Sequence, residues 1–452
     1  MKTYPIPDKI KQFASVFNQN GFCLYIVGGA VRDHLLGKPN SDYDFCTDAL
    51  PEQVISIFRK VIPTGIKHGT VTVMFKNEAF EVTTFRTEGH YSDQRHPDNV
   101  TFVRSLEEDL SRRDFTINAF ASNCLDGKII DLFNGFEDLK QKTIRAIGNP
   151  KERFEEDALR MMRLARFCAK LGFSPDDKTK EAAEELSANI DIVSQERIFD
   201  ELSKMLMSEK PTVGLRILED TGLLAHILPE VQACREIPQT KVGSSDVLEH
   251  IYNCVDASAS LGYGLTIRLA SLLHDIGKVK TMVLNQYGFM RFYGHDIKSA
   301  EMAREVMRRL KCSNTLTDDV CVIIANHMVR YSDSWTDGAV KRFIRRVGRE
   351  NIDNLFELQW CDQIASEGRA KVEEYDPLIQ RIKDLENQPL EIKDLAVTGE
   401  DLASIGIPKS KEMGAILSQL LEMVLDYPTL NHKEALLDQA RRLHEKNVLT
   451  DK

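Results

Sequence analysis

The sequence predicts an α+β protein, in which a mixed region of strands and helices precedes a long all-helical region. Short apolar or β-branched runs alternate with helical segments from Leu24 to about Ile147, whereas helical periodicity dominates from about Glu152 onward. At 452 residues the chain is about three times as long as a domain of roughly 150 residues. We therefore expect several domains, and place them at residues 1–147, 148–235, 236–375 and 376–452.

Composition limits the classes of function. The chain has 59 basic and 69 acidic residues, hence a net charge of −10, which excludes a broadly basic nucleic-acid coat but permits a local basic groove. The sequence contains no run of 18 apolar residues, so we expect no membrane span, and the start of the chain predicts no secretion because it lacks an apolar h-region. The nine cysteines include no CxxC pair, which predicts reduced thiols in a cytoplasmic protein.

The first candidate site follows a short strand. Leu24–Val27 is an apolar run that ends at Gly28 and Gly29, and Ala30–Leu36 reads as a helix that Gly37 stops. A Gly-Gly turn between strand and helix lets backbone N–H groups approach a phosphate, where the helix dipole favours negative charge. Gly28 and Gly29 are therefore candidate nucleotide-binding residues, although many such turns are only turns.

Carboxylates follow this turn. Asp42 and Asp44 lie two apart on an expected strand, so their side chains share one face. Thr70–Phe75 and Ala79–Phe85 predict a hairpin, whose second strand would bring Glu81 to the same region. Such carboxylates repel one another unless a cation lies between them, and magnesium commonly uses carboxylates together with substrate phosphates. The alternative is a solvated Asp-x-Asp loop.

A third pattern lies in the segment from Glu156 to Arg166. Asp157, Arg160 and Arg163 advance by three, so on a helix they would line one face, which Arg166 continues. They can form a solvated salt-bridge ladder, or an Asp acceptor beside Arg donors can read the edge of a base by hydrogen bonds. Spacing does not choose between these interpretations.

Residues from about 24 to 200 resemble the class II tRNA nucleotidyltransferases, which are the CCA-adding enzymes and their bacterial poly(A) polymerase relatives. Seven stretches carry the resemblance, in the family's order and spacing: LYIVGGAVRDHLLG, SDYDF, KHGTVTV, EVTTFRTEGHYSD, RSLEEDLSRRDFTINA, RFEEDALRMMRLARF and SQERI. The resemblance implies a head with the DNA polymerase β nucleotidyltransferase fold, followed by a helical neck, body and tail.

The resemblance also implies roles for individual residues. Asp42 and Asp44 would hold the catalytic magnesium ions, with Glu81 as a third carboxylate. Gly29, Arg32 and Arg113 would contact the incoming nucleotide, chiefly its triphosphate. Asp157 and Arg160 would hydrogen-bond the base edge of CTP or ATP, and Arg163 and Arg166 would make further contacts with the nucleotide. The implied reaction is two-metal phosphoryl transfer, in which the Asp157–Arg160 pair replaces a nucleic-acid template.

The family includes members that add CCA, only CC or only the final A, and members that make poly(A) tails. Members that add only CC typically lack a loop between the catalytic carboxylates and the RRD motif. That stretch is complete here from Thr87 to Arg104, with Glu88, Asp93, Arg95 and Asp98 present. We therefore expect full CCA addition, with addition of A alone or of poly(A) as the alternative.

A second constellation lies in the helical region. It combines imidazoles and carboxylates in and beside apolar helices, and consists of His250, His274, Asp275, His295, His327 and Asp362. Such ligands suit zinc, manganese, iron, nickel or magnesium. Residues 245–365 resemble the HD-domain metal-dependent phosphohydrolases, which implies a four-residue metal site at His250, His274, Asp275 and Asp362 and a second metal at His295 and His327. The alternative is a helical scaffold with satisfied core histidines or an idle site.

Residues 394–445 resemble the family's tail, which contacts the acceptor and T-arm of tRNA, but a plain helical hairpin explains them almost equally well. The basic run Lys341–Arg346 is a candidate for phosphate contacts or a solvated helix face.

The expected protein is thus a cytoplasmic tRNA 3′-end nucleotidyltransferase that uses CTP, ATP and magnesium and is fused to an HD domain that binds a further divalent metal. One rival is an HD phosphohydrolase with the head as an RNA-binding module, and another is a non-enzymatic RNA-binding scaffold. The oligomeric state stays open.

Overall fold

The computed structural model describes residues 2–39, 42–88, 100–241, 243–287, 289–385 and 387–450. The chain divides into two compact units, one comprising Met1–Gln232 with Arg309–Lys311 and the other Ala233–Arg308 with Cys312–Lys452. The finer division into four domains stays a prediction. Among the described residues, none of the helices combines the length and the apolar character that crossing a bilayer requires.

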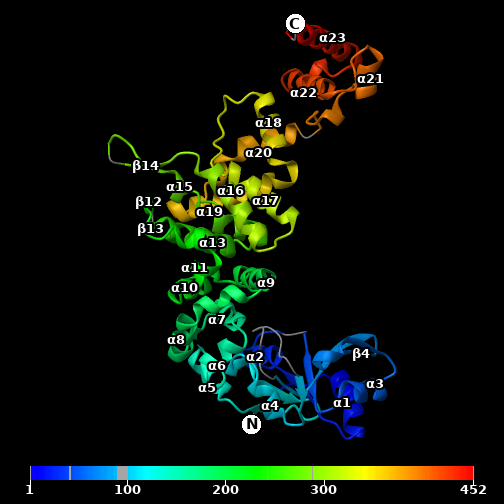
Figure 1. Ribbon diagram of the computed structural model, residues 1–452, viewed down its shortest axis with the longest axis vertical. Coiled ribbons are helices and arrows are strands. Elements are labelled where there is room, and N and C mark those ends of the chain that lie inside the picture. Colours follow the sequence, from blue (N-terminus) through cyan, green and yellow to red (C-terminus); the bar gives the residue numbers. More distant parts are fainter. Residues whose placement is uncertain are drawn as a thin grey trace. The chain divides into compact units, whose positions relative to one another are not determined.

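A seven-stranded mixed sheet organises the N-terminal part of the first unit, drawn in blue and cyan in Figure 1. The strand order is β3-β4-β5-β2-β1-β8-β9. Only β2 and β5 pair in parallel within it, as their neighbours run antiparallel. The strands are β1 (Leu24–Val27), β2 (Asp44–Thr47), β3 (Val61–Gly65), β4 (Thr70–Phe75), β5 (Glu78–Thr84), β8 (Phe120–Asn123) and β9 (Ile129–Asp131).

The predicted hairpin is present. β4 and β5 pair from Thr70 opposite Thr83 to Phe75 opposite Glu78. Lys76 and Asn77 connect them with φ values of 47° and 65°. Two central residues with positive φ make a type I′ turn, whose twist matches that of the flanking strands.

The helices of this region cover the sheet. They are α1 (Asp8–Gln19), α2 (Gly29–Leu35), α3 (Pro51–Ile57), α4 (Leu106–Ser111) and α5 (Gly135–Gln141). Phe13 of α1 is fully buried, and its ring lies 4.9–5.6 Å from five other rings, those of Phe17, Phe45, Phe58, Phe75 and Phe80. This aromatic cluster fixes α1 against the sheet. Shorter elements complete the region: η1 (Ile66–His68), β6 (Arg86–Glu88), β7 (Val100–Phe102), η2 (Thr116–Asn118) and β10 (Thr143–Ile144).

Helices form the rest of the first unit, as predicted. α7 packs against α9 and α10, which lie beside it in Figure 1. At Gly214 of α10 an added Cβ would lie 2.3 Å from Met205 Sδ and 2.9 Å from the carbonyl oxygen of Ala165, so only glycine permits this approach. The elements are α6 (Pro150–Glu156), α7 (Leu159–Leu171), β11 (Ser174–Pro175), α8 (Asp177–Glu185), η3 (Ser187–Ile192), α9 (Gln195–Leu206), α10 (Pro211–Asp220), α11 (Leu223–Ile227) and α12 (Pro229–Gln232).

The second unit is helical apart from two short ribbons that the sequence analysis did not foresee. α13 packs against α14 and α19, and α14 packs against α17. The ribbons are β12 (Pro238–Lys241) with β13 (Ser244–Asp246), and β14 (Met282–Leu284) with β15 (Met290–Phe292). The helices up to the tail are α13 (Val247–Ser260), α14 (Leu265–Leu273), α15 (Lys278–Thr281), α16 (His295–Arg309), α17 (Asn314–Asn326), α18 (Asp337–Val347), η4 (Arg349–Asn351), α19 (Ile352–Glu367), η5 (Val372–Glu374) and α20 (Asp376–Asp384).

The tail begins with η6 (Ile392–Asp394) and α21 (Gly399–Ser404). The Thr398 hydroxyl accepts a hydrogen bond from the N–H of Asp401, whose carboxylate accepts from the N–H of Thr398, so a capping box starts α21. α22 (Lys411–Asp426), η7 (Pro428–Leu430) and α23 (Lys433–Thr450) follow, and α22 packs against both α18 and α23.

Candidate functional site

The glycine turn after β1 borders a cavity of about 730 Å³ in the first unit. Gly28 has a φ of +69°, which favours glycine, and a Cβ there would lie 3.1 Å from Nη1 of Arg113. Glycine thus lets the Arg113 guanidinium approach the turn. Both predicted glycines, Gly28 and Gly29, line this cavity together with Arg113.

The three predicted carboxylates come from neighbouring segments. Asp44 begins β2 and pairs in register with Glu81 of β5. Asp42 precedes the strand, which corrects the expectation that Asp42 and Asp44 alternate along one strand. Partial burial and the charge of Asp42 raise the pKa of Asp44, although the charge of Arg113 opposes this shift. Because the carboxylates destabilise each other's charge, the site suits a divalent cation with oxygen ligands.

Cationic side chains predominate in the lining of the cavity. Besides Arg113, seven arginines and a lysine line the cavity: Arg32, Arg86, Arg112, Arg160, Arg163, Arg166, Arg197 and Lys170. The lining has three aspartates, Asp44, Asp114 and Asp157. Arg32 is buried, and it donates from Nη1 to Asn118 Oδ1 at 2.5 Å and from Nε to Asp33 Oδ1 at 2.8 Å. A concave site with fixed guanidinium groups is suited to a polyanion such as a triphosphate.

Asp109 supports the arginines of the RRD segment, and the sequence analysis missed it. Its buried Oδ1 accepts from Nε and Nη2 of Arg112 at 3.1 and 2.9 Å and from the N–H of Arg86 at 3.2 Å. Its Oδ2 lies 3.5 Å from Nη2 of Arg113. The signal was available, since Asp109 of α4 precedes these arginines, which directly follow the helix, by three and four residues.

Asp157 does not lie on the helix with the arginines that follow it. It is an extended residue after α6, with φ −146° and ψ 102°, and α7 starts at Leu159. Its Oδ1 accepts from the N–H of Leu159 at 3.1 Å and its Oδ2 from Nη2 of Arg197 at 2.7 Å. The predicted i,i+3 ladder is therefore wrong at its first member, because α6 and α7 are separate helices.

Arg160 is buried at the start of α7 and lines the same cavity. Its Nη1 donates to Glu156 Oε2 at 2.7 Å and to the carbonyl oxygen of Arg153 at 3.1 Å, and its Nη2 to the carbonyl oxygen of Arg112 at 2.8 Å. These contacts fix the guanidinium, so Asp157 and Arg160 present an acceptor and a donor to one cavity. This arrangement has the polarity needed to read a base edge.

Arg163 and Arg166 line the cavity, but buried acids also engage them. Arg163 donates to Asp114 Oδ2 from Nε at 2.8 Å and from Nη2 at 2.7 Å, and its Nη1 lies 3.4 Å from Glu201 Oε1. Arg166 pairs with the other oxygen of Glu201. Burial alone would raise the pKa of Asp114, but Arg163 and hydrogen bonds from Asn118 and Phe115 lower it to about 2. Asp114 and Glu201 were also missed by the sequence analysis.

The second constellation lies within the second unit, where the structure brings all six predicted residues together. They come from five elements or their ends: His250 from α13, His274 and Asp275 after α14, His295 from α16, His327 after α17 and Asp362 from α19. Asp275 is shared by two groups that can hold a metal, one with His250 and His274 and one with His295 and His327. His250 Nε2 also lies 3.0 Å from Asp362 Oδ1.

Hydrogen bonds fix the tautomers of three of these imidazoles. Nδ1 of His274, His295 and His327 donates to the carbonyl oxygen three residues earlier, at 2.9, 2.7 and 2.7 Å. In a neutral imidazole Nε2 then carries a lone pair. The three Nε2 atoms face the Asp275 carboxylate at 3.2, 3.3 and 4.0 Å. Burial lowers the pKa of His327 to about 4, so this ring is neutral at pH 7.

Imidazole lone pairs that face a buried carboxylate favour a cation between them, and these ligand types fit a divalent metal. Lys278, which the sequence analysis did not single out, places an ammonium group beside one oxygen of the same carboxylate. Its buried Nζ lies 2.5 Å from Asp275 Oδ2 and donates to Gln239 Oε1 at 2.8 Å. A cavity of about 1030 Å³ adjoins the cluster and includes Lys278, Arg291, Arg330 and Lys371 in its lining. A site that combines metal ligands with cationic side chains can bind a phosphate ester and promote its hydrolysis.

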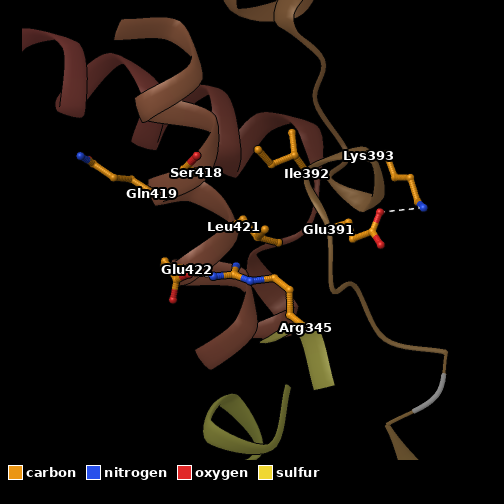
Figure 2. A pocket seen from close by; sticks show the side chains of 8 residues that line it. All are labelled: Arg345, Glu391, Ile392, Lys393, Ser418, Gln419, Leu421 and Glu422. Carbon is orange, nitrogen blue, oxygen red and sulfur yellow. Dashed lines mark hydrogen bonds and ion pairs between the residues drawn. The ribbon is translucent and has the colours of Figure 1, made fainter. Parts of the chain in front are cut away.

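The basic run on α18 is partly buried and partly exposed. Lys341 is fully buried and donates to the carbonyl oxygen of Leu425 at 3.0 Å, while Arg346 donates to Asn326 Oδ1 at 2.7 Å. Arg342 and Arg345 pair with acids of α22. Figure 2 shows Arg345 beside Glu422 at a pocket of about 490 Å³. The run thus joins α18 to α17 and α22, and only Arg345 and Arg346 are exposed, as a solvated face predicts; the phosphate contacts stay a prediction.

One predicted feature lies outside the described residues. Asp93, Arg95 and Asp98, which argue for complete CCA addition, are not described, whereas Glu88 ends β6.

Known family models match three parts of the chain. A model described as "Poly A polymerase head domain" matches residues 24–145, which include the glycine turn and the carboxylates. "Probable RNA and SrmB- binding site of polymerase A" matches residues 172–234, and a "tRNA nucleotidyltransferase domain 2" model matches residues 294–440.

Curated relatives cover nearly the whole chain. The CCA-adding enzyme of Enterococcus faecalis is 35% identical, with 99% of each chain covered. That of Pediococcus pentosaceus is 37% identical, with 94% of this chain and 95% of the relative covered. Among solved structures, Bacillus stearothermophilus CCA-adding enzyme in complex with CTP matches with a TM-score of 0.73 and 32% identity over 99% of this chain and 100% of that one. Thermotoga maritima CCA-adding enzyme complexed with tRNA shares the fold at a TM-score of 0.54 and 20% identity, over 98% and 100% of the chains. The chain belongs to the class II tRNA nucleotidyltransferases, as a member of the CCA-adding enzymes.

Proposed function

We propose that this protein adds C, C and A in turn to the 3′ end of tRNA, from CTP and ATP and without a nucleic-acid template. One observation carries the proposal: a single cavity combines a glycine turn, Asp44, an excess of arginines and the Asp157–Arg160 pair. These are the parts that nucleotidyl transfer with protein-directed base choice requires. The solved relative named for its complex with CTP supports the same reading.

Asp42, Asp44 and Glu81 would hold magnesium, because the charge of Asp42 raises the pKa of Asp44 and the strand pairing places Glu81 opposite Asp44. When bound, such ions lower the pKa of the tRNA 3′-hydroxyl and stabilise the departing pyrophosphate. Arg32 and Arg113 bind and orient the triphosphate, since both line the cavity beside the glycine turn. This positioning keeps the α-phosphorus in line with the attacking hydroxyl.

Base choice belongs to Asp157 and Arg160. Cytosine and adenine each present an amino group beside a ring nitrogen that accepts, whereas uracil and guanine present the reverse pattern. Asp157 accepts from the amino group and Arg160 donates to the ring nitrogen, so both correct bases fit and the incorrect ones do not. Arg163 and Arg166 contribute positive charge, while Asp114 and Glu201 hold them in place.

The partner is tRNA, whose acceptor stem and T-arm we propose to lie along the helical part and tail. None of the nine cysteines, all of which the structure describes, forms a disulfide, which agrees with a reducing compartment and supports a cytoplasmic location. The alternative within this class is addition of A alone or of poly(A).

The test supplies CTP and ATP, separately and together, to tRNA transcripts that end before CCA, after C and after CC. Addition of C, C and A in order to the shortest transcript supports the proposal. Extension of only the CC-ended transcript by ATP identifies an A-adding enzyme, and repeated A addition identifies a poly(A) polymerase.

A second candidate function rests on the six residues around Asp275, called here the Asp275 cluster: His250, His274, Asp275, His295, His327 and Asp362. We propose that it binds a divalent metal through His250, His274, Asp275 and Asp362, that His295 and His327 hold a second ion, and that the site hydrolyses phosphate esters as HD-domain proteins do. The facing acceptors of three imidazoles and Asp275 support this proposal. The test measures bound metal and hydrolysis of 2′,3′-cyclic and monoester phosphates. Asp362→Asn should remove hydrolysis and spare nucleotide addition, and Asp44→Asn should do the opposite.

A further inference from the structure

The two-stranded ribbon β14–β15 borders the cavity beside the Asp275 cluster and leads directly into one of its histidines. Strand β15 ends at Phe292, whose carbonyl oxygen accepts a hydrogen bond from Nδ1 of His295 at 2.7 Å. The Phe292 ring also lies 5.5 Å from Nζ of Lys278, which pairs with Asp275. The ribbon is therefore a wall of the candidate metal site, and one of its ends is joined to that site.

One row of this wall interleaves aromatic and cationic side chains. Phe289, Arg291 and Tyr293 alternate along and beside the strand β15, so its extended backbone places them on one face. All three line the cavity and are exposed, Phe289 by 62% and Tyr293 by 73%. Aromatic rings that alternate with a cation at the mouth of a cavity are typical of surfaces on which unpaired bases stack.

We propose that Phe289, Arg291 and Tyr293 form a stacking surface for the unpaired bases at the end of an RNA strand, whose terminal phosphate reaches the Asp275 cluster. The proposal rests on the phosphate-ester hydrolysis proposed for this cluster and deepens it by naming the substrate class. In that hydrolysis the oxygen of a water forms a bond to phosphorus, the bond from phosphorus to the ribose oxygen breaks, and the ribose oxygen takes one proton of the water.

The charges of the cavity suit the phosphates of a strand. Arg291 and Arg330 line it, are exposed and form no ion pair with a residue that the structure describes. Lys371 differs from them, because its Nζ lies 2.6 Å from Glu367 Oε2 and 3.7 Å from Glu374 Oε1. The two guanidinium groups can therefore bind phosphates, while the neighbouring acids are engaged by Lys371.

Two buried polar atoms in the wall also point to a ligand. Gln359 is 5% exposed, and its Nε2 donates to the carbonyl oxygens of His327 and Val329, both at 2.9 Å. Its Oε1 has no hydrogen-bond partner among the described residues, and the same holds for the buried Nε2 of Gln239, whose Oε1 accepts from Lys278. Both glutamines line the cavity. Buried polar atoms without partners are costly, and the hydroxyls and base edges of RNA offer both a donor and an acceptor.

Hydrogen bonds at the turn of the ribbon fix the backbone of Phe289. Oδ1 of Asn285 accepts from the N–H groups of Tyr287 and Phe289 at 3.0 and 2.9 Å. The N–H of Asn285 donates to the carbonyl oxygen of Phe289 at 2.9 Å. A turn held in this way reduces the entropy that is lost when a base stacks on the ring.

The test compares two phosphate esters in the presence of manganese: the ribodinucleotide ApA with a 3′-terminal phosphate, and glycerol 2-phosphate, which has no base. Phe289→Leu keeps an apolar side chain and removes the aromatic face. The ratio of kcat/KM for the dinucleotide over glycerol 2-phosphate should therefore fall by about tenfold, chiefly through KM. Phe289→Trp should keep the ratio, because it restores an aromatic face. Arg291→Gln should lower the ratio and weaken its dependence on salt.

Tyr287→Leu is the matched control, because Tyr287 is an exposed aromatic residue of the same ribbon that lies outside the cavity lining. It should equal wild type. An unchanged ratio in Phe289→Leu overturns the proposal, and so does an equal fall in Tyr287→Leu, which would indicate a distorted ribbon. If Phe289→Leu does not fold, Tyr293→Leu takes its place with the same expectation.

Two further outcomes separate this proposal from its rivals. If the ratio is unchanged and sedimentation shows that Phe289→Leu abolishes self-association of wild type, the aromatic row is a contact between two copies of the chain, and the proposal is wrong. If wild type hydrolyses neither ester, the proposed hydrolysis fails. Calorimetric titration with the dinucleotide then tests the stacking surface alone, and an equal Kd for wild type and Phe289→Leu overturns it.

Discussion

Asp44 and Glu81 lie directly opposite each other as paired residues of the parallel strands β2 and β5. The hairpin β4–β5 returns the chain to the sheet beside β2, so the pairing register places the two carboxylates together. With Asp42 nearby, the pKa of Asp44 is raised by partial burial and by like charge. The fold thus sustains a repulsion that a divalent cation would relieve.

Replacement of Asp44 by Asn should abolish nucleotide addition, with a loss of at least about a thousandfold. The folded state should not lose stability, because the substitution removes a charge that its surroundings disfavour. Magnesium should raise the Tm of wild type and have little effect on that of the variant. Addition assays and thermal unfolding with and without magnesium check this. A variant that keeps both its activity and its response to magnesium would rule out Asp44 as a ligand.

The buried pair of Asp114 and Arg163 should make the protein sensitive to acid. The pKa of Asp114 is about 2 in the folded protein, against an ordinary value of 3.8. A group with a depressed pKa contributes stability above its unfolded pKa, and this contribution is lost as the pH falls toward 2. The shift corresponds to about 2 kcal/mol. Urea unfolding of wild type and Asp114→Asn should therefore show a difference that is largest at neutral pH and shrinks below pH 4. A difference independent of pH would contradict this linkage.

The local elements of the head follow from the sequence. Leu24–Val27, the glycine turn and the β4–β5 hairpin are where apolar runs and turn chemistry predict them. The boundary between α6 and α7 was missed, because a spacing of three residues between Asp157 and Arg160 fits one continuous helix as well as it fits two helices with a break between them. In the structure the break appears as the extended backbone of Asp157, whose carboxylate accepts from Arg197 on another helix.

Supporting residues were harder to predict than ligands. The six residues of the Asp275 cluster were recognisable by their type, and the structure brings them together. Asp109 and Lys278 each lie three residues from a partner of opposite charge, but this spacing is also common on solvated helices and does not by itself indicate a buried supporting residue. The basic run on α18 shows that residue type can also mislead. Four cations within six residues indicate an exposed surface, but Lys341 is completely buried and donates to a carbonyl oxygen of α22.

Two groups of ligands share Asp275, which predicts two metal ions in each chain at saturation. Replacement of His295 by Ala should remove one of them and leave the ion at His250 and His274. Elemental analysis and calorimetric titration with manganese or zinc measure the stoichiometry. His226→Ala is the control, because His226 is a partly exposed histidine that pairs with Asp191. A single ion in wild type, unaffected by His295→Ala, would show that the second group is not a site.

Arg342 should contribute to stability and not to tRNA affinity. It donates to Glu422 Oε2 at 2.7 Å and to Asp426 Oδ1 and Oδ2 at 3.0 and 2.6 Å, which links α18 to α22. Because these groups are partly exposed, Arg342→Ala should lower the free energy of unfolding by at most about 1 kcal/mol. The Kd for tRNA and its salt dependence should stay within about twofold, because a phosphate contact alone would change the salt slope. A clearly reduced slope would restore Arg342 as a phosphate ligand.

Lys278 should oppose metal binding while it assists phosphate binding. Its ammonium lies 2.5 Å from Asp275 Oδ2, where it competes with a metal for the same carboxylate. Lys278→Met removes this cation and should increase the affinity for a divalent metal by about tenfold or more, since like charges at this range repel strongly in a buried site. The same change should weaken inhibition by inorganic phosphate, because Lys278 lines the adjoining cavity. Lys280→Met, which changes an exposed lysine of the same helix α15, is the control. Chelator competition and phosphate titration separate the two effects, and a loss of metal affinity in Lys278→Met would instead make Lys278 a support of the metal site.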